Sequence, residues 1–405
     1  MENQNLSHLL IKNPSIYFLP GVTSQSIDTC FRLLEDNHQH YHVFFNKEHA
    51  FHNHTSHHLL AALGFGASSK VLERIYNEQK KQQMPIEPLH KKDEFDVKKC
   101  MGNDNYYHDY LEFFRNELES KKYENNIDEM IEDYLFNKDY LVHFLSGAFH
   151  SFIHLGYALE FQSKLMAIEE HLNWNKDGNK TALEIIELIS QDQQFANKLF
   201  YKKGDFGSKV AELLDEHVGS LIAEYAQMWK CDLNDLRRAD ILINAGVLRR
   251  KKQARLDFFL MHATTSSLFL DIFVHSFKNK ENQSKFLRAK FATDLVYYIA
   301  RGRPKLDLNY LFNDYQVSKE HLYSDTHNPW LPLIEKSLTH PDEHVMKSIR
   351  ALVYAEKFDL AEDKEKIPYL KIAQMTMDVM FPFNEKNWTH EGIGWDEFWK
   401  TVPDL

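Results

Sequence analysis

The chain has 405 residues, of which 43% are hydrophobic and 26% are charged. This composition supports a large buried core and excludes a chain that is mainly disordered. The formal net charge is −11, and an acidic chain repels phosphate backbones, so we expect no nucleic-acid partner. The three cysteines are widely spaced and form no CxxC pair, which excludes a disulfide scaffold and fits a reducing cytoplasm.

No segment is expected to cross a membrane. The N-terminal residues do not place a basic stretch before an apolar one, so no export signal is predicted. The window 141–161 is apolar and long enough to span a bilayer, but it carries His143, His150 and His154 and includes Glu160 near its end. Polar groups are costly in lipid, so we interpret this window as a buried helix with a polar stripe.

Helical patterning dominates the chain, and only 14 glycines and 11 prolines interrupt it. Residues 1–26 are irregular, and residues 85–105 are polar without clear periodicity, which predicts a long surface excursion. Ser68 or Ser69 is expected to cap the helix that follows. Apolar periodicity predicts helices at 27–37, 54–63, 70–83, 107–121, 127–136, 139–162, 181–190, 210–229, 233–245, 254–275, 284–300, 344–357 and 364–380.

Strand alternation is almost absent, and no internal repeat, linker or change of composition marks a domain boundary. We therefore predict an all-α fold. The chain is interpreted as a single large multi-helix domain over residues 1–405, with a buried metal or substrate site between helices.

The chain contains 23 histidines, and several recur inside apolar helical segments at the spacing of one helix face. A lone buried histidine is usually a satisfied core residue. Four apolar helices that each carry an inward histidine change that expectation, because a neutral imidazole is a good ligand for Fe, Zn, Cu or Ni. Spacing alone does not name the metal. The positions are His54 and His58; His143, His150 and His154; His262; and His344 with Lys347 three residues later.

Other patterns are weaker. The chain has no HExxH or GxSxG motif, and the glycines near residue 65 form neither a dinucleotide nor a phosphate loop. Glu87 and His90 match the ExxH of di-iron helices, but Pro85 and Pro88 argue against a helix there. An earlier group is expected to lie on the surface or in loops: His38, His40, His42, His49 and His52.

Five strings in fixed order make the chain similar to a known family: HNHTSHHLLAALGFGAS, GAFHSFIHLGYALEF, FFLMHATTSSLFL, DEHVMKSIRALVYAEK and GWDEFW. Together they cover about residues 52–399, and they resemble the questin oxidase-like family. The resemblance implies an all-helical fold and oxygenases that open a ring of anthraquinone-type substrates with O2. Members have been described as Baeyer–Villiger-type oxidases without flavin.

The resemblance also implies a non-haem Fe(II) held by several histidines, with a lysine carboxylated by CO2 as a further ligand in some relatives. Carried onto this sequence, the ligands are His54, His150, His262, His344 and Lys347. A carbamate on Lys347 would replace the usual carboxylate of such sites. The plainer alternative is an ion pair of Lys347 with Glu343 or Asp342. NADPH has been suggested for relatives, but this chain shows no fingerprint for it.

Two further histidines are expected to be catalytic. His58 and His154 each lie four residues from a predicted ligand, and spacing does not decide which member of each pair binds metal. Whichever is not a ligand could be the base that ionises the substrate, because imidazole titrates near neutrality.

We therefore expect an O2-dependent, iron-dependent oxygenase that opens a ring of a polycyclic aromatic or quinone-like substrate, by C–C cleavage or Baeyer–Villiger-type oxidation. Its partners would be a small aromatic molecule and O2. Two alternatives of other classes use the same residues. One is a Zn or Mn hydrolase, and the other is a non-catalytic binder of an aromatic ligand.

Overall fold

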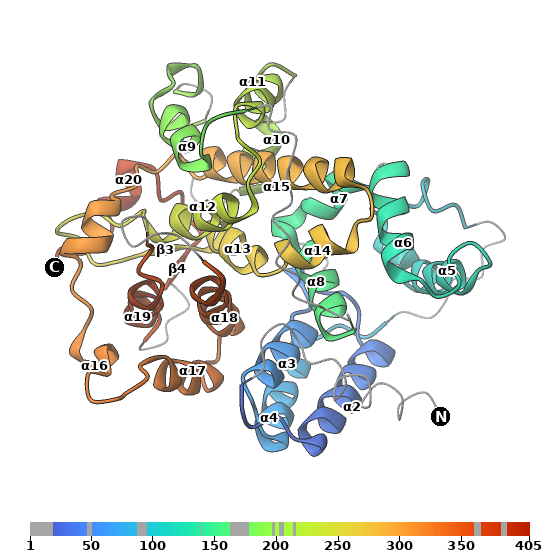
Figure 1. Cartoon of the computed structure of the whole chain (residues 1–405). Helices are drawn as coiled ribbons and strands as arrows, with labels where there is room; N and C mark the ends of the chain where they lie inside the picture. The colour runs from blue at the N-terminus through green and yellow to red at the C-terminus, as the bar shows by residue number, and fades with distance from the viewer. Residues whose placement is uncertain are drawn as a thin grey trace. The chain divides into compact units, whose positions relative to one another are not determined.

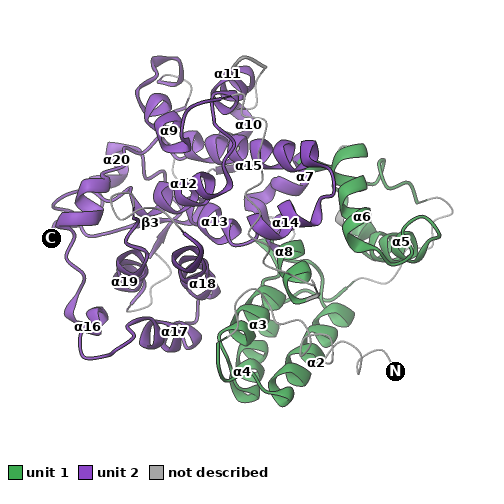
Figure 2. Cartoon of the chain, viewed as in Figure 1, with its two compact units in different colours: residues 1–141, 154–166 green, residues 142–153, 167–405 purple. Residues whose placement is uncertain are grey.

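The computed structural model describes residues 19–46, 51–86, 95–138, 140–162, 178–196, 199–201, 206–213, 216–359, 366–381 and 387–405. Helices dominate these residues and confirm the predicted all-α fold (Figure 1). The ExxH match at Glu87 and His90, which the prolines argued against, lies outside the described residues, as do His49 and most of the irregular N-terminal segment. The chain divides into two compact units, and the prediction of one domain stays a prediction (Figure 2).

Unit 1 comprises residues 1–141 and 154–166. Helices α2, α3 and α4 pack against one another, and two short antiparallel strands connect the first two of them. Its described elements are α2 (Ser24–His40), β1 (Phe44–Asn46), β2 (Phe51–His52), α3 (Thr55–Gly64), α4 (Ser69–Gln79), η1 (Lys80–Gln82), η2 (Asp104–Tyr106), α5 (Tyr107–Glu119), α6 (Ile127–Glu132) and the π-helical turn η3 (Asp133–Asn137).

Local signals place the ends of these helices. Thr23 caps α2 through a reciprocal capping box with Ser26. Ser68 occupies the N-cap position of α4, as predicted, although its side chain makes no capping hydrogen bond. Gly66 ends the α3 segment at φ +81°, where a Cβ would approach the Pro20 carbonyl oxygen to 2.6 Å. Only glycine fits this close approach of two backbone segments.

Unit 2 comprises residues 142–153 and 167–405. Its centre is a row of packed helices in which α12 contacts α13, α13 contacts α18, and α18 contacts α19 (Figure 1). Its elements up to residue 276 are α7 (Leu141–Leu145), η4 (Gly147–Phe149), α8 (His150–Gln162), α9 (Ala182–Gln191), η5 (Gln193–Phe195), α10 (Phe206–Leu213), α11 (Glu216–Gln227), α12 (Leu233–Ala245), β3 (Leu256–Asp257), α13 (Phe258–Ser267) and α14 (Leu270–Ser276). Helix α7 begins at the last residue of unit 1, and α8 continues into that unit from His154 on.

The remaining elements of unit 2 are α15 (Lys280–Ala300), η6 (Tyr310–Asp314), α16 (Lys319–Leu322), α17 (Trp330–Leu338), α18 (Glu343–Phe358), α19 (Tyr369–Met380), β4 (Trp388–Thr389) and α20 (Asp396–Trp399). Strands β3 and β4 pair in parallel. Periodicity missed α16, α17 and α20, which are short helices. It also missed both strand pairs, which are too short to show alternation.

The prediction of one continuous helix over residues 139–162 is wrong. Gly147, Ala148 and Phe149 have φ values of 57°, 53° and 61°, which no right-handed helix accommodates. Helix α15 stabilises this break, because the Tyr297 hydroxyl accepts a hydrogen bond from the Ala148 N–H at 2.9 Å. His143 consequently lies on α7, exposed, and shares no helix face with His150.

The predicted helix 254–275 is also interrupted. It begins as strand β3, continues as α13 and turns by 48° into α14. Among the described residues no single helix is long and apolar enough to span a membrane, and the bent pair α13 and α14 meets the length and composition criteria only when the two are taken together. Most residues of this pair are buried inside unit 2.

A buried charge cluster joins α12 to α15 inside unit 2. The Lys290 ammonium contacts Asp240 Oδ2 at 2.9 Å and Asp294 Oδ1 at 2.7 Å, and all three side chains are buried. Burial alone would lower the pKa of Lys290, but the two carboxylates raise it above its usual value. Burial raises the pKa of Asp294 well above its usual range, and the neighbouring Asp240 adds to this effect.

We predict that Lys290→Met strongly destabilises the protein. The substitution leaves two carboxyl groups buried without their cation, which costs about 3–5 kcal/mol. The free energy of unfolding in urea, followed by circular dichroism, measures the loss. Lys285→Met on the same helix is the matched control, because Lys285 is exposed and its ion pair with Glu281 lies on the surface. Equal stability of the two variants would contradict a structural role for the cluster.

Candidate metal centre

Three predicted ligands come together in unit 2. The His150 and His262 rings lie with centroids 4.9 Å apart, and the His262 and His344 rings lie 5.2 Å apart. All three side chains are buried. They come from the first residue of α8, the middle of α13 and the first turn of α18. Segments more than 190 residues apart in sequence therefore meet at one imidazole cluster.

The three rings are oriented in the same way by oxygen acceptors. Nδ1 of His150 lies 2.5 Å from the Gly147 carbonyl oxygen, and Nδ1 of His262 lies 2.8 Å from the Phe258 carbonyl oxygen. A carbonyl oxygen only accepts, so each contact assigns the ring proton to Nδ1 and the lone pair to Nε2. Histidine ligands of metals are typically held in this way.

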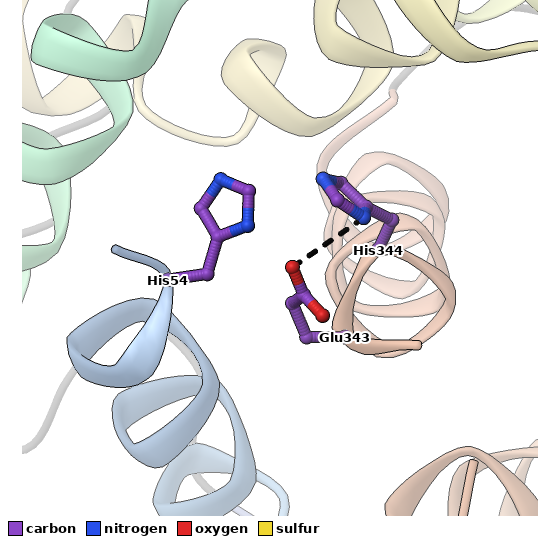
Figure 3. A group of neighbouring side chains, drawn as sticks. All are labelled: His54, Glu343 and His344. Atoms are coloured by element: carbon purple, nitrogen blue, oxygen red, sulfur yellow. Dashed lines mark ion pairs between the residues drawn. The ribbon is translucent and has the colours of Figure 1, made fainter. Parts of the chain in front are cut away.

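The Asp342 carboxylate orients the His344 ring in the same way, as an acceptor at Nδ1. Its Oδ1 lies 2.8 Å from His344 Nδ1 and also accepts the His344 backbone N–H at 2.9 Å, which caps α18. Burial alone would raise the pKa of Asp342, but the charge and hydrogen bond of His344 lower it below its usual value. Glu343 Oε1 lies 3.5 Å from the same ring nitrogen, as the dashed line in Figure 3 shows.

Lys347 lies one turn after His344 on α18 and is buried. Burial lowers the pKa of its ammonium group, and the nearby Glu343 and Asp342 offset only part of that effect. Within the part of the chain that the structure describes, no hydrogen bond or ion pair involves its Nζ. The ion pair with Glu343 or Asp342, which was the plainer alternative for Lys347, is therefore not found among the described residues.

Helix α13 is anchored at its start by Asp257. The carboxylate accepts the backbone N–H groups of Phe259 and Leu260 and so caps the helix. It also pairs with Arg301, which is fully buried, at 2.7 Å. Because His262 lies about one turn into this helix, the anchor fixes the position of its ring.

The remaining predicted residues belong to unit 1. His54 precedes the first turn of α3, where Figure 3 labels it, and its carbonyl oxygen accepts the His58 N–H. His58 Nδ1 lies 3.3 Å from the Gln79 side-chain amide nitrogen on α4, which is the donor in this hydrogen bond. His154 Nδ1 lies 3.1 Å from Nε2 of His57.

Sequence reasoning missed three histidines. His57 lies one step from the i, i+4 pair of His54 and His58 and so falls outside the predicted helix face, yet its ring contacts both His154 and Tyr157. His42 was expected on the surface or in a loop; it does lie in the loop before β1, but it is buried beside Tyr107. His390 follows β4, outside any periodic segment, and stacks on Phe258 at 4.3 Å. A loop carries no periodicity, so only the fold reveals His390.

The fold and these clusters define a helical protein whose buried imidazoles form a donor set suited to a transition metal. The sequence profile of the questin oxidase-like family matches residues 51–352. The chain therefore belongs to the questin oxidase-like family, as its motifs predicted, and is an enzyme of an oxidase family.

Curated relatives cover almost the whole chain. Baeyer-Villiger oxidase ptaJ of Pestalotiopsis fici is 27% identical, with 94% of each chain covered. Baeyer-Villiger monooxygenase dmxR6 of Cryptosporiopsis sp. is 30% identical, with 95% of each chain covered. Questin oxidase of Aspergillus terreus is 26% identical, with 94% of each chain covered.

We predict that Lys347→Met stabilises the metal-free protein. Methionine has a similar length and removes the cost of burying an ammonium group that has no ion pair among the described residues. The folded-state pKa is lowered, so the unfolded chain binds more protons between that pKa and 10.5, and the wild type gains stability as the pH rises through this window. The difference between variant and wild type should therefore be largest at neutral pH and shrink towards pH 10.5.

Urea unfolding at several pH values, after treatment with a chelator, measures this difference. Lys290→Met again provides the contrast, because it removes a buried lysine that has two carboxylate partners. If both substitutions destabilise the protein alike, Lys347 is a structural residue.

Proposed function

We propose that the protein is a non-haem iron oxygenase that opens a ring of a polycyclic aromatic or quinone-like substrate with O2, by C–C cleavage or Baeyer–Villiger-type oxidation. The observation that carries this proposal is the cluster of His150, His262 and His344, three buried imidazoles with matched tautomers. The family supports the oxidative chemistry, because its curated relatives are named as Baeyer-Villiger oxidases and questin oxidases.

The donor type and the ring spacing of these residues support iron as the metal of this proposal. Two imidazoles on one ion, with bonds of about 2.1 Å, have ring centres roughly 4.5–5.5 Å apart. The separations of 4.9 and 5.2 Å in unit 2 fall in that range. Neutral imidazole is a donor that suits iron, and the oxygen acceptors at each Nδ1 increase the basicity of Nε2. His54 remains the fourth ligand that the sequence motif predicts.

Lys347 would supply the anionic ligand. Its lowered pKa favours the neutral amine, whose nitrogen attacks CO2. A new N–C bond forms, the amine proton leaves to solvent, and the product is a carbamate anion. No flavin is needed in this scheme, and NADPH remains an untested addition.

Fe(II), when bound, supplies a centre that orients substrate and O2 and stabilises negative charge as it develops. The chain's own residues do the rest. The three imidazoles and Lys347 would hold the ion, and all four side chains are buried. A histidine base would take the proton of an acidic hydroxyl or enolisable ketone, since neutral imidazole accepts a proton near pH 7. The sequence predicts His58 or His154 for this role.

We predict that His262→Ala and His344→Ala each abolish stoichiometric iron binding. Elemental analysis of purified protein measures the metal, and circular dichroism confirms that each variant is folded. His275→Ala is the control, because His275 lies on α14, exposed, with Nδ1 bonded to the Asp271 carbonyl oxygen. Unchanged iron in both site variants would remove the proposed centre, and bound zinc or manganese would favour the hydrolase.

We predict O2 consumption coupled to loss of a hydroxyanthraquinone substrate, with a turnover that Lys347→Met abolishes. An oxygen electrode with a panel of hydroxyanthraquinones measures both quantities. A hydrolase would convert substrate without O2. A non-catalytic binder would bind the panel with equal affinity in wild type and Lys347→Met and consume nothing. Either result would replace the oxygenase.

A further inference from the structure

We propose that His390 is a catalytic residue that binds the substrate's acidic hydroxyl and accepts its proton. This inference rests on the proposed oxygenase function and assigns its base to a residue of unit 2. Neither the sequence motifs nor the helix periodicity pointed to His390, which lies beyond the residues that the family profile matches.

The short parallel sheet places His390 beside the imidazole cluster. Leu256 pairs with Trp388, and Asp257 pairs with Thr389. Phe258 directly follows β3, and His390 directly follows β4. Their rings stack with centroids 4.3 Å apart and planes 26° apart. The pairing of β3 with β4 therefore places the His390 ring beside Phe258.

Phe258 connects His390 to the predicted metal ligands. Its ring centroid lies 4.9 Å from the His262 ring and 5.0 Å from the His344 ring. One aromatic side chain thus contacts both ligand imidazoles and His390. A flat substrate held near the cluster would have His390 within the reach of its ring substituents, because only the width of Phe258 separates the two.

The backbone at His390 is held in place, although the side chain is exposed. The Arg301 guanidinium pairs with Asp257 and donates to the Glu391 carbonyl oxygen. The Glu391 N–H donates to Thr389 Oγ1 at 3.1 Å, which closes a tight turn around His390. A catalytic side chain on such a rigid backbone loses little freedom when it meets its substrate.

The His390 ring is available for proton transfer. Among the residues that the structure describes, neither ring nitrogen makes a hydrogen bond or an ion pair, and the side chain is exposed. By contrast, His58 bonds to Gln79 and His154 lies against His57. Those two side chains would have to give up an existing contact before they could accept a substrate proton.

Partial burial of His390 favours its neutral form, and the charges around it act in both directions. One side of the His390 ring packs against neighbouring side chains and is shielded from water. This desolvation lowers the pKa of His390 below 6.5. Arg301 at the end of α15 and His344 on α18 lower it further, while Asp257 on β3 and Asp342 before α18 raise it. The net shift is downward, so at pH 7 the imidazole carries a lone pair that is ready to accept a proton.

The proposed step is a single proton transfer. The O–H bond of a phenol or enol breaks, an N–H bond forms on the imidazole, and the electron pair stays on the substrate oxygen. The products are an imidazolium and a phenolate or enolate, and they attract each other. The electron-rich anion is the form of the substrate that O2 oxidises more easily.

The binding test uses full-length protein stripped of metal with a chelator and kept free of O2. A hydroxyanthraquinone changes colour when its phenol ionises, so a spectrophotometric pH titration reports the ionised fraction of bound ligand. We expect the pH at which half of the bound ligand is ionised to be at least one unit lower in wild type than in His390→Gln. His275→Gln, an exposed histidine on α14, should behave as wild type. Equal titration in wild type and His390→Gln overturns the proposal, and so does a wild type that binds no ligand or only the neutral form.

The activity test separates this inference from the proposed function. With iron and O2 present, we expect His390→Gln to lower kcat about 100-fold while iron content stays unchanged. Wild-type activity should fall as the pH drops below the lowered pKa, since protonated imidazole cannot act as a base, and the variant should lose this dependence. Added imidazole should partly restore activity to His390→Ala, because the position is exposed.

The failures are distinguishable. If wild type ionises the ligand but never consumes O2, the oxygenase function fails while the role of His390 stands. If His390→Gln turns over with the kcat and pH profile of wild type, the role of His390 fails while the oxygenase stands.

Discussion

The buried ion pair of Asp257 and Arg301 is the interaction on which the arrangement of unit 2 depends. Asp257 belongs to β3, caps α13 and neutralises Arg301. Through these contacts one carboxylate sets the start of the helix that carries His262, and the arginine holds the segment that carries His390. Both side chains are fully buried, where an unpaired charge would be costly, so the pair requires β3 and the end of α15 to be in place together.

Two buried lysines in the same unit have opposite pKa shifts because their surroundings differ. Lys290 contacts two carboxylates, which raise its pKa and keep it a cation. Lys347 has no ion pair among the described residues, and burial lowers its pKa. The first arrangement stabilises the fold. The second is unfavourable for an ammonium group, and a neutral amine that reacts with CO2 would relieve that cost. For this reason we propose Lys347, and not Lys290, as the site of the carbamate.

The break at Gly147 shows how a strained backbone positions the proposed ligand His150. Three residues in the left-handed region end α7, and α8 starts directly at His150. Non-glycine residues pay for this conformation. Here α15 offsets the cost, since Tyr297 bonds to Ala148 and the Lys290 ammonium lies 4.3 Å from the Phe149 ring. The turn also supplies the Gly147 carbonyl oxygen that orients the His150 ring.

The sequence by itself determined the helical class, the positions of most long helices and the histidines that lie on apolar helix faces. Periodicity carries that information because burial of a helix face repeats along the chain. The tertiary structure alone decided the break before His150, the grouping of three imidazoles in unit 2, their common tautomer and the place of His390. Those features depend on carbonyl oxygens, a two-residue strand pair and a buried arginine that come from distant segments, and no local pattern encodes such contacts.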